Sequence, residues 1–151
     1  MRKVIIGADH GGVGLKDQLV TMLRGENYEV VDLGTQGTTP IDYPKIAEQV
    51  ANEVVSSTTN NTCGILVCGS GIGVCISANK VKGIRCALVH DAYTARLCRQ
   101  HNDANVIALG ERVTGVEVAK EAVKIFLTTE FEGGRHANRV ALITDIESRG
   151  C

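Results

Sequence analysis

Tryptophan is absent from this chain of 151 residues, and only three tyrosines and two phenylalanines supply aromatic rings. With so few rings, the chain offers no platform on which the bases of a single-stranded nucleic acid could stack. The formal net charge of -1 also argues against a surface built for a polyanion. We therefore expect no nucleic-acid partner, and a core built from valine, isoleucine, leucine and alanine.

Long apolar runs are also missing, since no stretch of the sequence is long enough to span a bilayer. The first residues reach Gly7, Asp9 and His10 before the apolar stretch of a signal peptide could develop. We therefore expect no membrane partner and a cytoplasmic location. Hydrophobic residues make up 44% of the sequence, which argues against disorder, and the length fits one domain over residues 1–151.

The six cysteines form no Cys-x-x-Cys pair, and the four histidines lack zinc-site spacing with them. They are spread through apolar segments of a domain that is large enough to fold without disulfides, so we expect free or buried thiols. We also expect no metal and no cofactor. A redox-sensing thiol protein remains an alternative, but no resolving cysteine lies at short spacing.

Short runs of valine, isoleucine and leucine alternate with stretches of helical period about five times. This alternation predicts an α/β fold, a Rossmann-like three-layer α/β/α sandwich around a five-stranded parallel sheet. The predicted strands are residues 3–8, 28–33, 64–68, 85–89 and 106–109. The predicted helices are residues 13–24, 43–56, 72–81, 92–100, 116–128 and, after a Gly-Gly break, a tail helix over about 135–148.

The tail helix carries Val140, Ile143 and Ile146 on one stripe. Crossing onto a second subunit would bury that stripe and give a homodimer. Packing on its own domain fits the pattern equally well.

Ligands of open parallel sheets bind beyond the carboxyl ends of the strands, where the winding direction reverses. If the first and third strands are neighbours, the crevice lies between their ends. Those ends carry the segments Asp9-His10-Gly11-Gly12 and Cys68-Gly69-Ser70-Gly71-Ile72-Gly73.

The second of these segments follows a buried strand and opens a helix. Its glycines let the backbone N–H groups of Gly69, Gly71, Ile72 and Gly73 converge on an anion, and the helix dipole favours a thiolate at Cys68. A glycine-rich turn that merely ends the strand fits the pattern about as well.

Three familiar motifs fail on this segment. A Walker loop lacks its Gly-Lys-Ser/Thr ending, and the dinucleotide fingerprint would need glycine at position 74 or 76. A cysteine phosphatase would need arginine six residues after Cys68, where Val74 stands.

Asp9 and His10 can meet sugar hydroxyls or a phosphate, although they could also cap the next helix. Tyr43 could reach the crevice or simply pack. His101 and Asn102 lie on a predicted loop, where an imidazole could shuttle protons or remain a solvated bystander.

Arg135 and Arg139 stand i,i+4 on the tail helix, so their guanidinium groups share one face and could grip a phosphate, or form a solvated basic face. Arg112, after the fifth strand, is a third possible phosphate ligand.

Taken together, the chain closely resembles the ribose-5-phosphate isomerase B family, which also contains allose-6-phosphate and galactose-6-phosphate isomerases. The likeness covers essentially the whole chain. Its markers are Gly7-Ala8-Asp9-His10-Gly11-Gly12, Asp42-Tyr43-Pro44, Cys68-Gly69-Ser70-Gly71-Ile72-Gly73, Ala78-Asn79-Lys80, Gly83-Ile84-Arg85, Arg99-Gln100-His101-Asn102-Asp103 and Glu132-Gly133-Gly134-Arg135-His136.

The resemblance implies an aldose–ketose isomerase of the pentose phosphate pathway that interconverts ribose 5-phosphate and ribulose 5-phosphate without a metal. It implies a dimer, sometimes paired into a tetramer, with active sites built from two subunits. One branch of the family uses glutamate where Val74 stands and lacks the cysteine, so this chain resembles the thiol branch.

The resemblance also implies individual roles. Cys68 would move the proton between C2 and C1, Ser70 would handle the proton between the two oxygens, and His101 would help to open the furanose ring. Asn102 would hold the substrate, and the phosphate would go to His10, Arg112, Arg135 and Arg139. The same chemistry on allose 6-phosphate or galactose 6-phosphate, or a non-catalytic sugar-phosphate-binding protein, remains an alternative.

Overall fold

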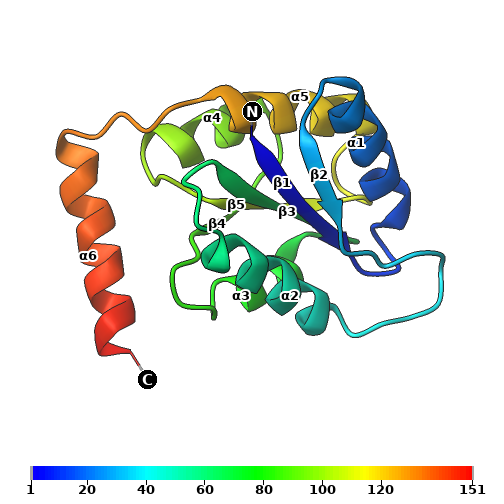
Figure 1. Ribbon diagram of the computed structural model, residues 1–151, viewed down its shortest axis with the longest axis horizontal. Coiled ribbons are helices and arrows are strands. Elements are labelled where there is room, and N and C mark those ends of the chain that lie inside the picture. The colour runs from blue at the N-terminus through cyan, green and yellow to red at the C-terminus, as the bar shows by residue number, and fades with distance from the viewer. Residues whose placement is uncertain (1, 151) are drawn as a thin grey trace.

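The computed structural model describes residues 2–150 and contains one five-stranded parallel sheet with the strand order β2-β1-β3-β5-β4. Helices α1, α4 and α5 cover one face of this sheet and α2 and α3 cover the other, which gives the three layers expected from the sequence (Figure 1). The strands are β1 (Lys3–Ala8), β2 (Glu29–Asp32), β3 (Thr62–Cys68), β4 (Cys86–Leu88) and β5 (Val106–Gly110). The helices are α1 (Val13–Gly25), α2 (Tyr43–Ser56), α3 (Ile72–Ala78), α4 (Ala92–Gln100), α5 (Val116–Thr128) and α6 (Arg135–Arg149).

The element boundaries match the predicted ones closely, and α3 differs most. The helical period predicted a helix to residue 81, but α3 ends at Ala78. Asn79 explains this end, because its side-chain amide donates to the carbonyl oxygens of Cys75 (3.0 Å) and Cys86 (2.9 Å). Its side-chain oxygen also accepts from the backbone N–H of Cys86 (2.8 Å), so the chain turns here toward β4.

The reversal of winding lies between β1 and β3, as predicted. β1 pairs with β2 on one side and with β3 on the other, and Ala8 at the end of β1 lies beside Val67 near the end of β3. Cys68 in turn pairs with Gly110 at the end of β5. The loops after β1, β3 and β5 therefore meet at one edge of the sheet, which we call the carboxyl edge.

Two apolar layers hold the sheet between its helices. On one side the buried members include Leu15, Leu19 and Phe126, and on the other Val50, Leu66 and Val74. The parallel strands are apolar on both faces because both faces are covered.

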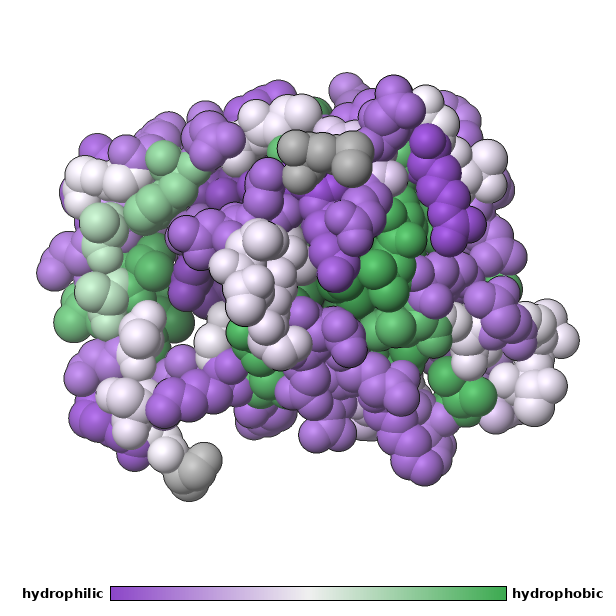
Figure 2. Space-filling model, in the orientation of Figure 1, coloured by the Kyte–Doolittle hydropathy of each residue, from purple (hydrophilic) through white to green (hydrophobic). Residues whose placement is uncertain are grey.

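Helix α6 stands apart from this body (Figure 1). Its buried residue is His136 near its start, and Glu147 near its end accepts a hydrogen bond from the backbone N–H of Gly83 (3.0 Å). Leu142, Ile143 and Ile146 are 56%, 43% and 62% exposed, and apolar surface gathers over this part of the molecule (Figure 2). Within residues 2–150, none of the helices combines the length and the apolar character that crossing a bilayer requires.

A buried ion pair joins α1 to the sheet. The side chain of Lys16 is fully buried, and its Nζ lies 2.8 Å from Asp32 Oδ2 and 2.9 Å from Asp17 Oδ1. Burial alone would lower the pKa of Lys16, but the bonds to both carboxylates raise it above its ordinary value. Burial would likewise raise the pKa of Asp32, but the hydrogen bonds from Lys16 and from the Gly34 N–H lower it.

We expect Asp32→Asn to lower the free energy of unfolding by about 2 to 4 kcal/mol at pH 7, because it leaves the buried ammonium of Lys16 with one partly exposed carboxylate. Urea denaturation measures the difference. The pKa of Asp32 is lowered in the folded state, so its contribution is present above the ordinary carboxyl range and is lost as the pH falls through the lowered value. The destabilisation should therefore shrink in acid.

Glu26→Gln serves as the matched control, because Glu26 pairs with the exposed Lys124 at 2.8 Å. An exposed pair contributes little, so this variant should unfold close to the parent protein. Equal effects of the two substitutions would contradict the importance of burial at Lys16.

Candidate active site

Cys68 ends β3 at the carboxyl edge and is 5% exposed. The backbone N–H of Gly71 points at its sulfur, with 3.0 Å between nitrogen and Sγ. An amide this close stabilises negative charge on sulfur. The next loop residue, Ser70, accepts the N–H of Ile72 on its Oγ at 3.2 Å. The glycine-rich loop therefore directs the amide of Gly71 at the sulfur and that of Ile72 at the Ser70 hydroxyl.

Three glycines permit this packing. A Cβ on Gly12 would lie 2.6 Å from the carbonyl carbon and oxygen of Val67, and one on Gly110 would lie 2.6 Å from the carbonyl group of Ser70. Gly71 has a φ of +80°, in the left-handed region that favours glycine. Side chains at these positions would push the three loops apart.

Asp9 and His10 lie on the carboxyl-edge loops, as the sequence predicted, and Tyr43, whose position the sequence left open, lies beside them. Asp9 is buried, and its Oδ1 accepts the N–H of Gly11 at 2.8 Å. The exposed His10 accepts the N–H of Ile41 on Nδ1 at 3.3 Å, so its neutral ring carries its proton on Nε2, free to donate. The ring of Tyr43 lies against Gly73, because a Cβ there would be 2.6 Å from Tyr43 Cε2.

Arg112 also reaches the carboxyl edge. Its guanidinium lies over Gly69, with one nitrogen 3.2 Å from the position of a Cβ on that glycine. Its neighbour Glu111, which sequence reasoning missed, accepts the N–H of Leu15 at 2.5 Å. The N-terminus of α1 is therefore capped by a carboxylate of the chain itself. The position of Glu111 directly after an apolar strand was the available signal.

The other predicted residues, His101, Asn102, Arg135 and Arg139, lie toward the opposite edge of the sheet. His101 and Asn102 follow α4 and precede β5, whose first residue, Val106, pairs with Gly64 near the start of β3. Four strand residues, roughly 13 Å, separate that end of β5 from the level of Cys68. The start of α6 lies on the same side, because the rings of His101 and His136 stack at 4.1 Å between centroids.

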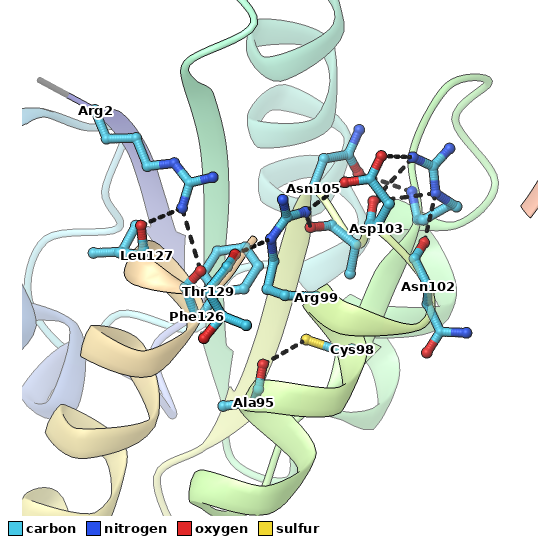
Figure 3. A network of polar contacts seen from close by, with 12 residues as sticks. Arg2, Ala95, Cys98, Arg99, Asn102, Asp103, Asn105, Phe126, Leu127 and Thr129 are labelled. Atoms are coloured by element: carbon cyan, nitrogen blue, oxygen red, sulfur yellow. Dashed lines mark hydrogen bonds and ion pairs between the residues drawn. The ribbon is translucent and has the colours of Figure 1, made fainter. Parts of the chain in front are cut away.

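The loop of His101 is held by two arginines of the marker segments, Arg99 and Arg85, to which the sequence assigned no role; Figure 3 labels Arg99 and its partner Asp103. Arg99 donates to Asp103 Oδ1 (2.8 Å), to the carbonyl of Ala104 (2.6 Å) and to the carbonyl of Thr129 (3.2 Å). Arg85 donates to the carbonyl of Asn102 (2.9 Å) and pairs with the Asp103 carboxylate (3.3 Å). This network fixes the backbone from which His101 and Asn102 project.

His101, Glu132 and His136 are a group that could offer ligands to a metal ion, with candidate ligand atoms within 4.8 Å of one another. The two rings are nearly parallel, at 12°, so their in-plane lone pairs run side by side and do not converge on one point. His136 is 4% exposed, and burial together with the neighbouring His101 lowers its pKa. The two imidazoles therefore stack and do not converge on a common ligand position, and the absence of a metal stays a prediction.

The comparisons with known proteins agree over nearly the whole chain. A sequence model described as "Ribose/Galactose Isomerase" matches residues 4–143. Ribose-5-phosphate isomerase B of Escherichia coli is 46% identical over 99% of both chains.

Two solved structures are similar in fold as well as in sequence. Ribose-5-phosphate isomerase B of Clostridium thermocellum has a TM-score of 0.94 at 48% identity and covers 97% of this chain and 98% of its own. The enzyme of Mycoplasma genitalium, solved with bound ribulose-5-phosphate, has a TM-score of 0.93 at 40% identity, with 98% and 97% covered. The matching segments, the shared topology and the level of identity show that the chain belongs to the ribose/galactose isomerase family.

Proposed function

We propose that the protein is an isomerase that interconverts D-ribose 5-phosphate and D-ribulose 5-phosphate, as a step of the pentose phosphate pathway in the cytoplasm. One observation carries the proposal: a buried sulfur, Cys68, lies against a backbone N–H in a glycine-rich loop at the point where the sheet reverses its winding. The bound ribulose-5-phosphate of the Mycoplasma genitalium enzyme and the identity of the Escherichia coli enzyme support this substrate.

The reaction needs a base and a set of donors. As a thiolate, Cys68 takes the proton from C2 of the open-chain aldose, which leaves an enediolate across C1 and C2. Return of the proton to C1 gives the ketose. Ser70 carries the remaining proton between the two oxygens. The negative charge that builds on oxygen is stabilised by backbone amides of residues 69–73; before substrate binds, the amide of Gly71 faces the Cys68 sulfur and that of Ile72 faces Ser70 Oγ.

Asp9, His10, Tyr43 and Arg112 surround the same loop and fit the rest of the substrate. The buried carboxylate of Asp9 can accept from a sugar hydroxyl, while His10 and Arg112 offer donors to the phosphate. Tyr43, packed on Gly73, forms an apolar wall beside the anion loop.

The remaining groups come from a second copy of the chain. In one chain, His101, Asn102, Arg135 and Arg139 lie too far from Cys68 to act on the same small molecule. Helix α6 carries two of these groups and exposes Leu142, Ile143 and Ile146, an apolar face that a second copy can cover. In the homodimer, which can pair further into a tetramer, His101 from one subunit opens the furanose ring above Cys68 of the other.

Two other functions remain testable. The same chemistry on allose 6-phosphate or galactose 6-phosphate would need only a slightly longer site. A sugar-phosphate-binding protein without catalysis would keep the anion loop but would not need the sulfur.

Cys68→Ala should reduce kcat by roughly 10²- to 10⁴-fold, the usual contribution of a positioned base, because no other thiol among the described residues lies in the loop. Coupled spectrophotometric assay of ribulose 5-phosphate formation measures the loss. Binding of a linear sugar-phosphate analogue, followed by calorimetry, should persist. Native turnover by the folded variant would exclude the thiol mechanism. Cys98→Ala is the matched control, because Cys98 is buried on α4, far from the loop.

Mixing two inactive variants tests the shared site. Cys68→Ala and His101→Asn each abolish both sites of their own homodimer. A mixed dimer regenerates one intact site and one site with both substitutions, so random reassortment should restore about a quarter of the parental activity. If Cys68 and His101 worked within one chain, mixing would restore nothing.

Substrate choice is checked by comparing kcat/KM for ribose 5-phosphate, allose 6-phosphate and galactose 6-phosphate. We expect the pentose to be preferred by about tenfold or more, the usual scale for one additional carbon in a closed site. A preference for either hexose would overturn the substrate assignment.

Turnover should also survive EDTA, since fixed amides stabilise the enediolate in place of a metal.

A further inference from the structure

Two half-buried cysteines, Cys75 of α3 and Cys86 at the start of β4, lie side by side outside the groups described above. The two side chains lie close enough for the titration of each thiol to depend on the other. When Cys75 is protonated, its Sγ can also donate to the carbonyl oxygen of Cys86 at 3.5 Å. Eleven positions separate the two residues in sequence, and the turn after α3 brings them together.

Asn79 fixes the two segments relative to each other. Its side chain binds the carbonyl oxygen of Cys75 and both backbone polar groups of Cys86, at 2.8 to 3.0 Å. Its Nδ2 also lies 3.6 Å from the sulfur of Cys75. One side chain therefore holds both cysteine backbones, so the Cys75 sulfur stays beside Cys86 while α3 and β4 keep their places.

The two thiols differ in reactivity. The neighbouring thiol of Cys86 lowers the pKa of Cys75 to about 7, although burial opposes it and Asn79 assists it. The neighbouring Cys75, together with burial, raises the pKa of Cys86. At neutral pH, Cys75 is therefore a substantial fraction thiolate, and Cys86 is the protonated neighbour at its side.

The buried thiols of Cys63 and Cys98 have pKa values shifted in the opposite direction from that of Cys75. Burial raises the pKa of Cys63 to about 11 and that of Cys98 to about 11, and both are buried in the apolar layer that faces α1, α4 and α5. Thiols of this kind are inert toward oxidants. Cys63 and Cys98 are therefore natural comparison sites within the same chain.

We propose that Cys75 and Cys86 are a peroxide-reactive thiol pair that closes reversibly into an intrachain disulfide. The Cys75 thiolate attacks one oxygen of a hydroperoxide, the O–O bond breaks, and with one proton a water (or an alcohol) leaves and Cys75 becomes a sulfenic acid. Cys86 then attacks that sulfur, the S–O bond breaks, and the thiol proton leaves with the hydroxide as a second water. Two thiols are oxidised by two electrons and one peroxide is reduced.

The sequence indicated that no resolving cysteine was available, because none lies at short spacing from Cys68. The structure gives a resolving partner to Cys75, a cysteine that the sequence did not single out. Spacing along the chain missed the pair because a helix end and a turn intervene between its members.

One molar equivalent of hydrogen peroxide, added to the intact protein at pH 7, tests the proposal. The number of titratable thiols per denatured chain should fall from six to about four and return with dithiothreitol. Non-reducing tryptic mapping should join the peptide of residues 86–96 to that of residues 46–80. The second peptide also carries Cys63 and Cys68, so Cys75→Ser must abolish the link while Cys63→Ser and Cys68→Ser leave it in place.

Two further measurements keep the test decisive if a variant folds poorly. In the parent protein, iodoacetamide at pH 7 should modify Cys75 about tenfold faster or more than Cys63 and Cys98. In Cys86→Ser, dimedone should trap a sulfenic acid on Cys75. A disulfide between any other pair, a link between two chains, or oxidation of Cys75 to the sulfinic acid with Cys86 still free would overturn the proposal.

Discussion

The close approach of three backbone loops at the carboxyl edge is the constraint on which the rest of this molecule depends. Gly12 lies against the carbonyl group of Val67, and Gly110 lies against that of Ser70, at distances that leave no room for a Cβ. The loops after β1 and β5 therefore close around the end of β3. This contact brings Asp9 and Arg112 to Cys68 and determines where its amide donors point. The apolar layers, the parallel register and the ion pair of Lys16 hold the strands at the spacing that this contact requires.

Much of this arrangement could be predicted from the sequence, because it depends on patterns that parallel sheets make obligatory. Strands covered on both faces must be apolar throughout, which located all five. A reversal of winding between the first and third strands follows once their helices lie on opposite faces, and it identified the loops after Ala8 and Cys68 as neighbours. Residues at or just after the carboxyl end of a strand must lie at that edge of the sheet, so Asp9, Cys68 and Arg112 were predicted at one edge.

Contacts made by polar side chains across the fold could not be predicted in this way. The role of Asn79 depends on Cys86, that of Glu111 on the first turn of α1, and that of Lys16 on Asp32; periodicity describes none of these pairs. The separation of His101 from Cys68 is likewise a property of the sheet register. Helix α6 shows the same limit, because its apolar stripe fitted packing on its own domain as well as packing on another copy, and only the structure shows that the stripe is exposed in one chain.

In the proposed assembly, catalysis would be a collective property of two chains. A newly made single chain would carry every proposed site residue but hold these residues at opposite edges of its sheet, so it would be idle until it meets a second chain. Turnover then grows with the square of chain concentration when copies are scarce and only linearly once they are paired. A few chains in a dilute compartment would bind little sugar phosphate and convert almost none, whereas a modest rise in expression would switch the activity on steeply.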